Sequence, residues 1–447
     1  MSRLVGIAVA AFAVLAAIVG GPVWAQSSAD FDTSIDNNYP VNLEFNLSAS
    51  SDAEIVDVSL HYSLVGRGTS ALGKPEELLA GKAVSVSIEV KTNAQSSYIP
   101  VGSEFIYFWE VTLDDGTVVT SEEDAFFFLP PDQEWKTASN DIFIIYYHGD
   151  RDKTAELYLE AGTQTYNGVG KELLQANLTQ LPVKVILFSN EAEMDEARFG
   201  RSETFDSATV TCGTKVTNDI VLVIPRSCGS SDPTDVLRHE ITHILTEAAG
   251  ESALGKLPSW LDEGTAVHGQ SDPGDGYLDP FEIASQIDSL IPFAQMNTAV
   301  NDPRLTNLFY GQSWAMVEYL VQQYGEDSFA DLFATIKEGN RFDTALEEVY
   351  GFDLAGFEDE FRQSFGLDSD AEPTVAPTAA PRQDTARPTA VPTEVPAQTS
   401  VVSDDDGGIS LLVIIVIATA FLFVLLAVFF FLVSMMMASG RAGDGSA

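Results

Sequence analysis

Cysteine, histidine and basic residues are scarce in this sequence. Its 447 residues include two cysteines, Cys212 and Cys228, and no CxxC spacing, which excludes a zinc site built on cysteine pairs. Lysine and arginine together number 23 against 66 aspartates and glutamates, so the formal net charge is −43. A surface of this charge repels phosphate backbones, which excludes nucleic acid as a partner. Solubility, including solubility in a salty medium, is the favoured explanation of the acidic surface. A specific cationic partner is the alternative explanation.

The chain begins with an export pattern. Arg3, an apolar run over residues 4–19 and the small-residue step Val23-Trp24-Ala25 indicate a signal peptide over residues 1–25, with an uncleaved anchor as the alternative. In an oxidising compartment a disulfide between Cys212 and Cys228 is favoured over two free thiols. Such a bond would staple a short hairpin.

A second apolar run lies near the other end of the sequence. Residues 409–437 carry no charge, and these 29 residues, at about 1.5 Å per residue, exceed the roughly 30 Å hydrocarbon core of a bilayer. We therefore expect one transmembrane helix. Acidic residues precede it and Arg441 follows it, which predicts that residues 26–408 lie outside the cell and that residues 438–447 form a short cytoplasmic tail.

The segment before this apolar run has a biased composition. Residues 369–408 contain repeated Pro-Thr, Ala-Pro and Val-Pro steps and no apolar side chain larger than valine. A segment of this kind cannot bury a core, so we expect a semi-extended stalk.

Apolar and polar residues alternate with period two through much of residues 27–131. The alternation recurs in segments separated by turn-rich stretches, at residues 41–47, 56–64, 84–90 and 105–113. Several half-buried strands of this kind predict an N-terminal all-β domain, a small antiparallel sandwich. The domain resembles an immunoglobulin or fibronectin-III module in architecture only, because the immunoglobulin cysteine pattern is missing.

A different pattern follows Pro130-Pro131, which marks a domain boundary. Strand patterns and one early helical pattern come first, at residues 142–147, 182–188 and 219–224 for the strands and 153–174 for the helix. Helical periods then run from Pro233 to about Phe365. Residues 132–368 are therefore predicted to form an α+β domain with a helical C-terminal half.

The segment LRHEITHIL, residues 237–245, carries the strongest chemical signal. A cap and proline before it and Gly250 after it predict a helix of about four to five turns. His239 and His243, four positions apart, project from one face of that helix at a separation that one Zn²⁺ can bridge. Glu240 is then placed to take a proton from an activated water. A chance HExxH is expected about 0.006 times in a chain of this composition, so accident is a poor explanation.

Two histidines do not complete a catalytic zinc site, which takes three protein ligands and a water. Glu247 lies one more turn along the helix, too far up the axis to close a tetrahedron, and suits a supporting position or the solvent face. Glu263 and His268 lie on a second helix that begins at about Pro258. They are about 140° apart around its axis, so they cannot both face the metal. The sequence context favours the carboxylate of Glu263.

HEITH followed by WLDEG at residues 260–264 resembles the gluzincin metallopeptidases, in particular the peptidase MA-like group related to aminopeptidase N. The resemblance covers about residues 135–366 and implies a zincin-type fold. It also implies that His239, His243 and Glu263 hold zinc and that Glu240 is the general base. The metzincin continuation HExxHxxGxxH is absent.

The resemblance extends to a later helix. In this family a tyrosine on that helix hydrogen-bonds the oxyanion, and Tyr310 in YGQSWAMVEYL matches it, with simple packing of the ring as the alternative. The strand at residues 219–224 stands where zincins have an edge strand that pairs with substrate, and a plain core strand is the alternative. The G-x-M-E-N motif by which aminopeptidases bind a free amino end is absent.

These patterns together favour a membrane-anchored extracellular zinc metallopeptidase, an endopeptidase that acts on peptide or protein substrates. The alternatives are an inactive surface binding or adhesion protein that uses the β-sandwich, and an aminopeptidase. The intact Glu240 argues against loss of activity. The acidic stretch SDPGDGYLD at residues 271–279 does not fit the EF-hand spacing, so we expect an exposed turn there and not a calcium site.

Overall fold

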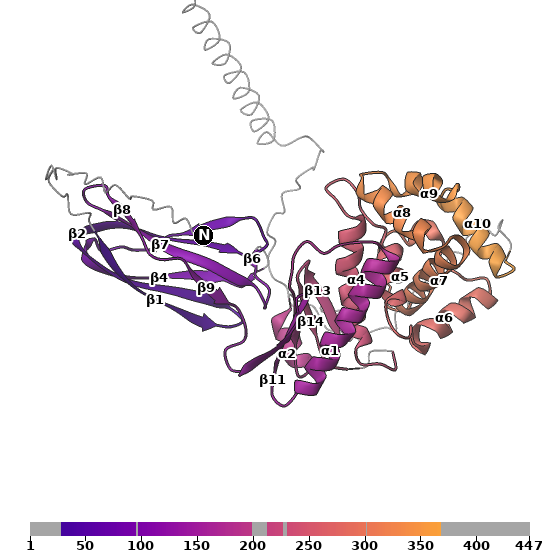
Figure 1. Ribbon diagram of the computed structural model, residues 1–447, viewed down its shortest axis with the longest axis horizontal. Helices are drawn as coiled ribbons and strands as arrows, with labels where there is room; N and C mark the ends of the chain where they lie inside the picture. The colour runs from indigo at the N-terminus through magenta and orange to yellow at the C-terminus, as the bar shows by residue number, and fades with distance from the viewer. Residues whose placement is uncertain (1–27, 95–96, 199–211, 227–229, 301, 368–447) are drawn as a thin grey trace, which may run out of the picture. The chain divides into compact units, whose positions relative to one another are not determined.

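The computed structural model describes residues 28–94, 97–198, 212–226, 230–300 and 302–367 (Figure 1). The predicted signal peptide, stalk, transmembrane helix and tail therefore lie outside the described residues. Within the described residues, no helix combines the length and the apolar character that a bilayer crossing requires.

The N-terminal part is rich in β-strands, as predicted. Its main strands form a seven-stranded antiparallel sheet, and a separate two-stranded ribbon consists of β5 (Asn93–Ala94) and β6 (Ser97–Tyr98). The strands of the larger sheet are β1 (Ala29–Asn38), β2 (Asn42–Leu64), β3 (Ser70–Gly73), β4 (Gly81–Lys91), β7 (Glu104–Leu113), β8 (Val118–Thr120) and β9 (Asp124–Phe127).

Strand β2 organises this part because it is 23 residues long and pairs along both halves. Its first half pairs with β1 and β4, and its second half pairs with β3 and β7. The Phe45 ring, in the first half, lies 5.2 Å from the ring of Tyr107 in β7, so the two halves pack face to face. The two strands predicted at residues 41–47 and 56–64 are thus one irregular strand that serves both layers. The likeness to immunoglobulin or fibronectin-III modules in particular stays a prediction.

A second sheet has five strands in the order β10-β11-β12-β14-β13. They are β10 (Trp135–Ser139), β11 (Phe143–His148), β12 (Val183–Leu187), β13 (Gly213–Thr217) and β14 (Ile220–Val223). The three inner strands are parallel, and the two outer ones pair antiparallel to their neighbours. Every residue of β12 and β14 is buried, as expected for parallel strands covered on both faces.

The strand predicted at residues 219–224 is β14, and it is an inner strand. The edge strand is β13. The sequence pattern did not predict it, because Gly213–Thr217 is short and mostly polar and shows no apolar alternation. The two strands form a hairpin, as expected for the segment between the cysteines. Cys212 is buried and disulfide-bonded, and its predicted partner Cys228 lies outside the described residues.

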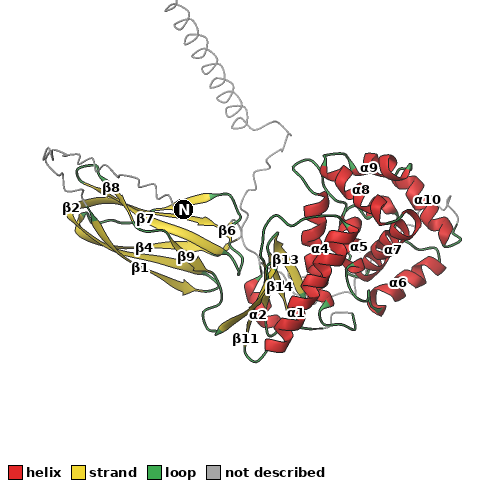
Figure 2. Ribbon diagram, viewed as in Figure 1, coloured by secondary structure: helices red, strands yellow, loops and turns green. Residues whose placement is uncertain are grey.

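Helices dominate the rest of the described residues (Figure 2). The pattern at residues 153–174 is α1 (Asp152–Thr165) continued by the π-helix η1 (Tyr166–Leu173), and α2 (Glu191–Ala197) follows β12. The later helices are α4 (Asp235–Gly250), α5 (Ser259–His268), α6 (Asp275–Gln286), the 3₁₀ turn η2 (Phe293–Gln295), α7 (Thr306–Tyr324), α8 (Glu326–Lys337), α9 (Phe342–Tyr350) and α10 (Leu354–Ser364). The predicted helical C-terminal half is confirmed.

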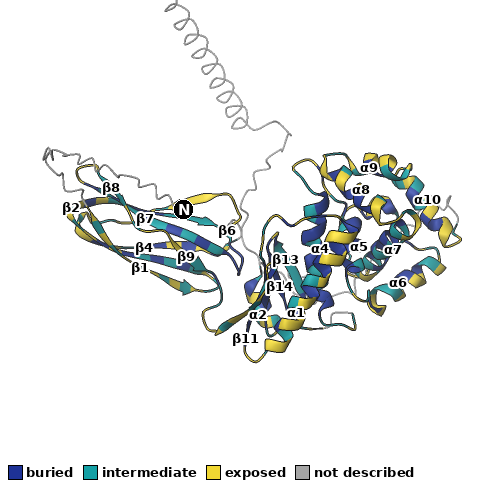
Figure 3. Cartoon of the chain, viewed as in Figure 1, coloured by how far each residue is buried: buried dark blue, intermediate teal, exposed yellow. Residues whose placement is uncertain are grey.

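Helix α4 is the central element of this region. It contacts α1, α5 and α8 as well as strands β13 and β14. Its buried residues include Leu237, Ile241 and Leu245, which are fully enclosed, whereas the outer helices keep one exposed side (Figure 3). The remaining face of α4, which carries His239, Glu240 and His243, is turned toward α5 and the edge strand.

Candidate active site

The helix predicted to carry the histidines is α4, and it ends at Gly250 as expected. Its first residue is Asp235, two positions after the predicted start at Pro233. The delay has a local cause, since Asp232 Oδ1 accepts hydrogen bonds from both the main-chain nitrogen and the hydroxyl of Thr234, at 2.8 Å each. A turn therefore precedes the first helical residue.

The two histidines lie together as their spacing predicts. The Nε2 atoms of His239 and His243 are 3.2 Å apart, and their rings meet edge to face at 84°. The i, i+4 spacing places both imidazoles on one face of α4, one turn apart.

Helix α5 brings Glu263 to the histidines from a separate element. Glu263 Oε2 lies 3.3 Å from His239 Nε2 and 3.4 Å from His243 Nε2. Helix α5 can pack this tightly because Gly264 follows the glutamate: a Cβ atom there would lie 2.3 Å from the carbonyl oxygen of Ser313 in α7. The glycine of WLDEG is thus explained by close helix packing. His239, His243 and Glu263 form a group that could hold a metal ion.

The dimensions of this group suit a small tetrahedral cation. Nitrogen and oxygen ligands about 2.0–2.1 Å from Zn²⁺ in tetrahedral geometry are about 3.3 Å apart. The three separations here are 3.2, 3.3 and 3.4 Å. These distances are long for hydrogen bonds, and Glu263 Oε2 is a buried atom without a well-aligned hydrogen-bond donor. The donor set of two imidazoles and one carboxylate therefore fits a zinc ion.

Two carboxylates set the electrostatics of this group. Burial alone would lower the pKa of His243, but the carboxylates of Asp262 and Glu263 outweigh it and hold that pKa well above its ordinary value. Burial likewise opposes ionisation of Glu263, yet His243 and His239 lower the pKa of Glu263 below its usual range. Both pKa shifts therefore favour ionised carboxylates next to a positive charge in this group.

Asp262 has a place at the site that the sequence reading did not assign. Its Oδ2 lies 2.9 Å from Nδ1 of His243, and the hydroxyl of Thr246 donates a hydrogen bond to its Oδ1. A carboxylate at the far nitrogen of a ligand imidazole fixes the orientation of the ring. The available signal was the acidic residue directly before Glu263 in WLDEG.

Glu240 is held by the edge strand. The main-chain nitrogen of Lys215 in β13 donates a 2.7 Å hydrogen bond to Glu240 Oε2. The Lys215 side chain donates to the carbonyl oxygen of His243 at 3.2 Å and to the Glu247 carboxylate. Glu247 is thus paired with Lys215, and Lys215 ties β13 to α4 on the face that carries the histidines.

Tyr310 of α7 also lies beside the site. Its ring, near the start of α7, is 6.1 Å from the ring of His239. It is stacked on Tyr277 at 5.1 Å and 19°. Helices α6 and α7 approach closely here, since a Cβ atom at Gly311 would lie 2.1 Å from the carbonyl oxygen of Tyr277.

Tyr277 is a second site residue that sequence reasoning missed. Burial, together with the charges of Glu263 and Glu240, raises the pKa of Tyr277 to about 12. The exposed turn predicted at residues 271–279 is only partly present, because α6 begins at Asp275. A helical spacing of Tyr277, Phe281 and Ala284 was the signal for this helix.

His268 is directed elsewhere, as its position on α5 predicted. Its Nδ1 lies 2.6 Å from Glu318 Oε1 of α7. That contact removes it from the set of candidate ligands.

Residues 173–366 match the family model of the peptidase MA superfamily. Over this segment the chain is similar to the peptidase MA superfamily. The match contains His239, Glu240, His243, Glu263 and Tyr310, and it leaves the β-rich N-terminal part outside. The predicted resemblance to gluzincin metallopeptidases is confirmed, and the chemistry of this domain is that of a metallopeptidase.

Solved structures offer more distant likenesses. An M1 zinc metallopeptidase from Deinococcus radiodurans is 10% identical, and the match covers 78% of this chain and 95% of that one with a TM-score of 0.32. A bromine derivative of BhCBM56 is 15% identical over 22% of this chain and 91% of that one, with a TM-score of 0.16. At TM-scores this low, neither likeness carries a functional argument. No curated protein matches the chain.

Proposed function

We propose that the peptidase MA domain is a zinc peptidase in which His239, His243 and Glu263 hold the ion. The observation that carries the proposal is the near-equilateral arrangement of their three donor atoms, with sides of 3.2 to 3.4 Å. Ca²⁺ takes six to eight oxygen ligands and is not suited to a donor set with two imidazoles.

The residues around the ion have separate tasks. Zinc, when bound, supplies Lewis acidity toward the scissile carbonyl and lowers the pKa of water. Glu240 takes the proton of the attacking water and delivers it to the leaving amine. Because the Lys215 main chain holds Oε2 of Glu240, the other carboxylate oxygen is left for the proton. Tyr310 donates a hydrogen bond to the oxyanion that develops on the substrate.

We propose further that cleavage occurs within chains. The amino-end recognition motif of the aminopeptidases is absent from the sequence. Strand β13 has β14 as its partner on one side and is the outermost strand of its sheet among the described residues. An extended substrate could pair with its outer edge beside Glu240. Peptides blocked at both ends should be cut as well as free ones, and a strict need for a free amino group would favour the aminopeptidase alternative.

We propose that the domain acts outside the cell on a membrane anchor. The basis is the sequence pattern of residues 1–25 and 409–437, which lie outside the described residues. Protease treatment of intact cells tests this placement. Removal of the domain from the cell surface is the expected result, and full protection would contradict it.

The decisive experiment uses residues 26–408 and the Glu240→Gln variant. We expect one equivalent of zinc in each protein. Hydrolysis of casein by the variant should be about 10² to 10⁴ times slower, because it lacks the general base. A zinc-loaded wild-type protein that cuts no unfolded protein, yet binds a surface ligand through its β-sandwich, would favour the adhesion alternative.

A further inference from the structure

Tyr277, near the start of α6, is a residue of the site that has no task in the proposed mechanism. Its ring is stacked on the ring of Tyr310 in α7, with centroids 5.1 Å apart and planes inclined by 19°. The Tyr310 ring in turn lies 6.1 Å from the ring of His239. Two tyrosines from separate helices therefore form a stacked pair beside a proposed zinc ligand.

Close packing of α6 on α7 holds this pair in place. The carbonyl oxygen of Tyr277 lies 2.1 Å from the position that a Cβ atom would take at Gly311, the residue after Tyr310. The Cβ atom of Phe281, one turn later on α6, lies 3.1 Å from the same position. The main chain of α6 is thus pressed against that of α7, so Tyr277 is positioned before any substrate binds, as a donor that stabilises a transition state must be.

The hydroxyl of Tyr277 is within reach of the charges of the site. Burial of the phenol and the carboxylates of Glu263 and Glu240 raise the pKa of Tyr277 to about 12. These carboxylates come from α5 and α4, so the phenol faces the residues proposed to bind zinc and to move the proton. At neutral pH the hydroxyl keeps its hydrogen and is able to donate it to an acceptor.

This hydroxyl has no hydrogen-bond partner among the residues that the structure describes. Oε2 of Glu263 lies between the two imidazoles, and Oε2 of Glu240 accepts from the main chain of Lys215. Tyr277 keeps part of its surface exposed, so a bound substrate can meet it. A donor that loses its water when substrate binds needs a new acceptor, and the substrate is the group that brings one.

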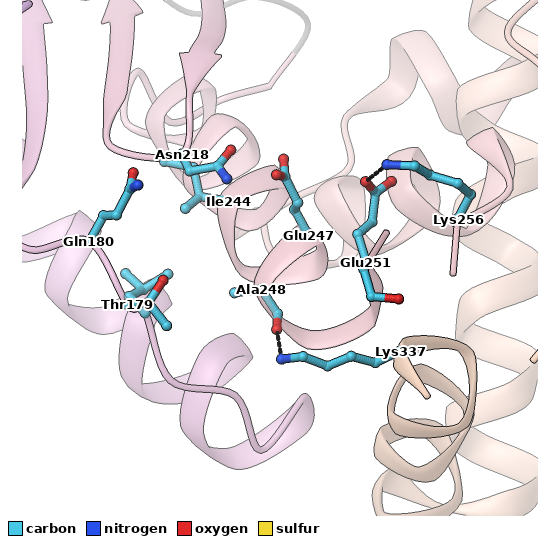
Figure 4. A pocket seen from close by; sticks show the side chains of 11 residues that line it. Thr179, Gln180, Asn218, Ile244, Glu247, Ala248, Glu251, Lys256 and Lys337 are labelled. Atoms are coloured by element: carbon cyan, nitrogen blue, oxygen red, sulfur yellow. Dashed lines mark hydrogen bonds and ion pairs between the residues drawn. The ribbon is translucent and has the colours of Figure 1, made fainter. Parts of the chain in front are cut away.

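A cavity of about 340 Å³ at the C-terminal half of α4 does not provide such a donor to the reacting carbonyl (Figure 4). Neither a proposed metal ligand nor a tyrosine is among its lining residues. Figure 4 shows Lys256 directed at Glu251 and Lys337 directed at the carbonyl oxygen of Ala248, so both lysines already have acceptors. The pair of tyrosines on α6 and α7 is the better source of donors.

We propose that the Tyr277 hydroxyl is a second hydrogen-bond donor to the oxyanion, beside the hydroxyl of Tyr310. Negative charge develops on the carbonyl oxygen of the substrate as water attacks, and two positioned donors stabilise it more than one does. Both tyrosines keep their protons throughout this step. The inference rests on the proposed peptidase function and adds a catalytic residue to it.

Tyr277→Phe removes the hydroxyl and keeps the stacked ring. In the full-length chain loaded with zinc, we expect kcat for a blocked peptide to fall by about 10- to 100-fold, the scale of one hydrogen bond to a charged group. KM and zinc content should not change. Tyr350→Phe is the matched control, because Tyr350 lies on α9 and its hydroxyl donates to the carbonyl oxygen of Ser328 at 3.3 Å. It should keep the wild-type kcat.

A phosphinic peptide tests the same contact without turnover. Its tetrahedral anion resembles the transition state, so its affinity for the zinc-loaded protein should fall in Tyr277→Phe by the same factor as kcat/KM. Calorimetry measures that affinity. The product peptides, which carry no tetrahedral anion, should bind to the variant as they bind to the wild type.

The outcomes separate this inference from the function on which it rests. Wild-type kcat and undiminished affinity for the phosphinic peptide in Tyr277→Phe would overturn it. A raised KM with unchanged kcat would also overturn it and would place the hydroxyl on the substrate before reaction. A loss that appears only in Tyr277→Leu, which removes the ring, would assign Tyr277 to the support of Tyr310.

Failure of the zinc-loaded wild type to cut any peptide would remove the peptidase function itself. Binding of the phosphinic peptide would still decide the contact in that case. Weaker binding by Tyr277→Phe than by the wild type would support a donor at this position, and equal binding would overturn it.

Discussion

Asp262 Oδ2 lies 2.9 Å from Nδ1 of His243, on the opposite edge of the imidazole from the nitrogen that faces Glu263. The hydroxyl of Thr246 holds the other oxygen of Asp262 in turn. A carboxylate this close to Nδ1 favours the orientation in which Nε2 of His243 serves as the ligand.

Asp262→Ala removes that support without removing a ligand. We expect zinc affinity to fall by about 10- to 100-fold while the fold is kept, since such supporting carboxylates have effects of this size. Competition with a chelator of known affinity measures the change. Asp275→Ala, at an exposed aspartate of α6, serves as the control and should bind zinc as the wild type does. Equal affinity in the two variants would show that the contact has no part in metal binding.

Zinc binding should strengthen as pH rises. In the metal-free protein the carboxylates of Asp262 and Glu263 raise the pKa of His243 well above 6.5, so zinc must displace a proton. The stability that this ion pair gives the metal-free protein is fully present below about pH 6.5 and is lost as pH rises through the raised pKa. Apparent affinity should therefore climb through that same interval.

Calorimetry of zinc binding in buffers of different ionisation enthalpy counts the released protons. Asp262→Ala lowers the pKa of His243 and should move the rise in affinity to lower pH. A proton release that is zero at all pH values above 6 would contradict this account.

Gly264→Ala tests the close packing that delivers Glu263. The added Cβ would lie 2.3 Å from the Ser313 carbonyl oxygen, which belongs to the main chain and cannot rotate away. We expect a loss of about 1–3 kcal/mol in the free energy of unfolding, the usual scale for overpacking, together with weaker zinc binding. Gly276→Ala is the matched control, since nothing lies within 4 Å of a Cβ atom there. Urea titration of both variants decides, and equal stability would contradict the packing argument.

Local patterns determine much of this fold, and for that reason the sequence predicted it. The i, i+4 spacing of His239 and His243 requires only a regular helix, and α4 is helical from Asp235 to Gly250. The predicted helix after Pro258 likewise needs no tertiary information, because Pro258 caps it and Ser259 begins it. Placement of Glu263 against the histidines came from the family resemblance, since loop geometry cannot be deduced from spacing.

The missed features depend on contacts between elements distant in sequence. Strand β13 has no apolar alternation, and it is a strand because β14 supplies its hydrogen bonds. Tyr277 reaches the site only because Gly311 lets α6 lie against α7. No local pattern connects Lys215 with Glu240, although their 2.7 Å contact holds the proposed general base. The sequence predicted two strands where the structure has the single strand β2, because the irregular middle of β2 resembles a turn.

Tyr310→Phe separates stabilisation of the transition state from binding. The variant keeps the ring stacked on Tyr277 but loses the hydroxyl, which the proposed mechanism needs only when the oxyanion forms. We expect kcat to fall by about 10²- to 10³-fold, as for one lost oxyanion donor, with KM and zinc content unchanged. Tyr319→Phe, on the same helix with its hydroxyl near Glu360, is the control and should keep full activity. A parallel loss in both variants would mean that aromatic packing in α7, and not the Tyr310 hydroxyl, limits the reaction.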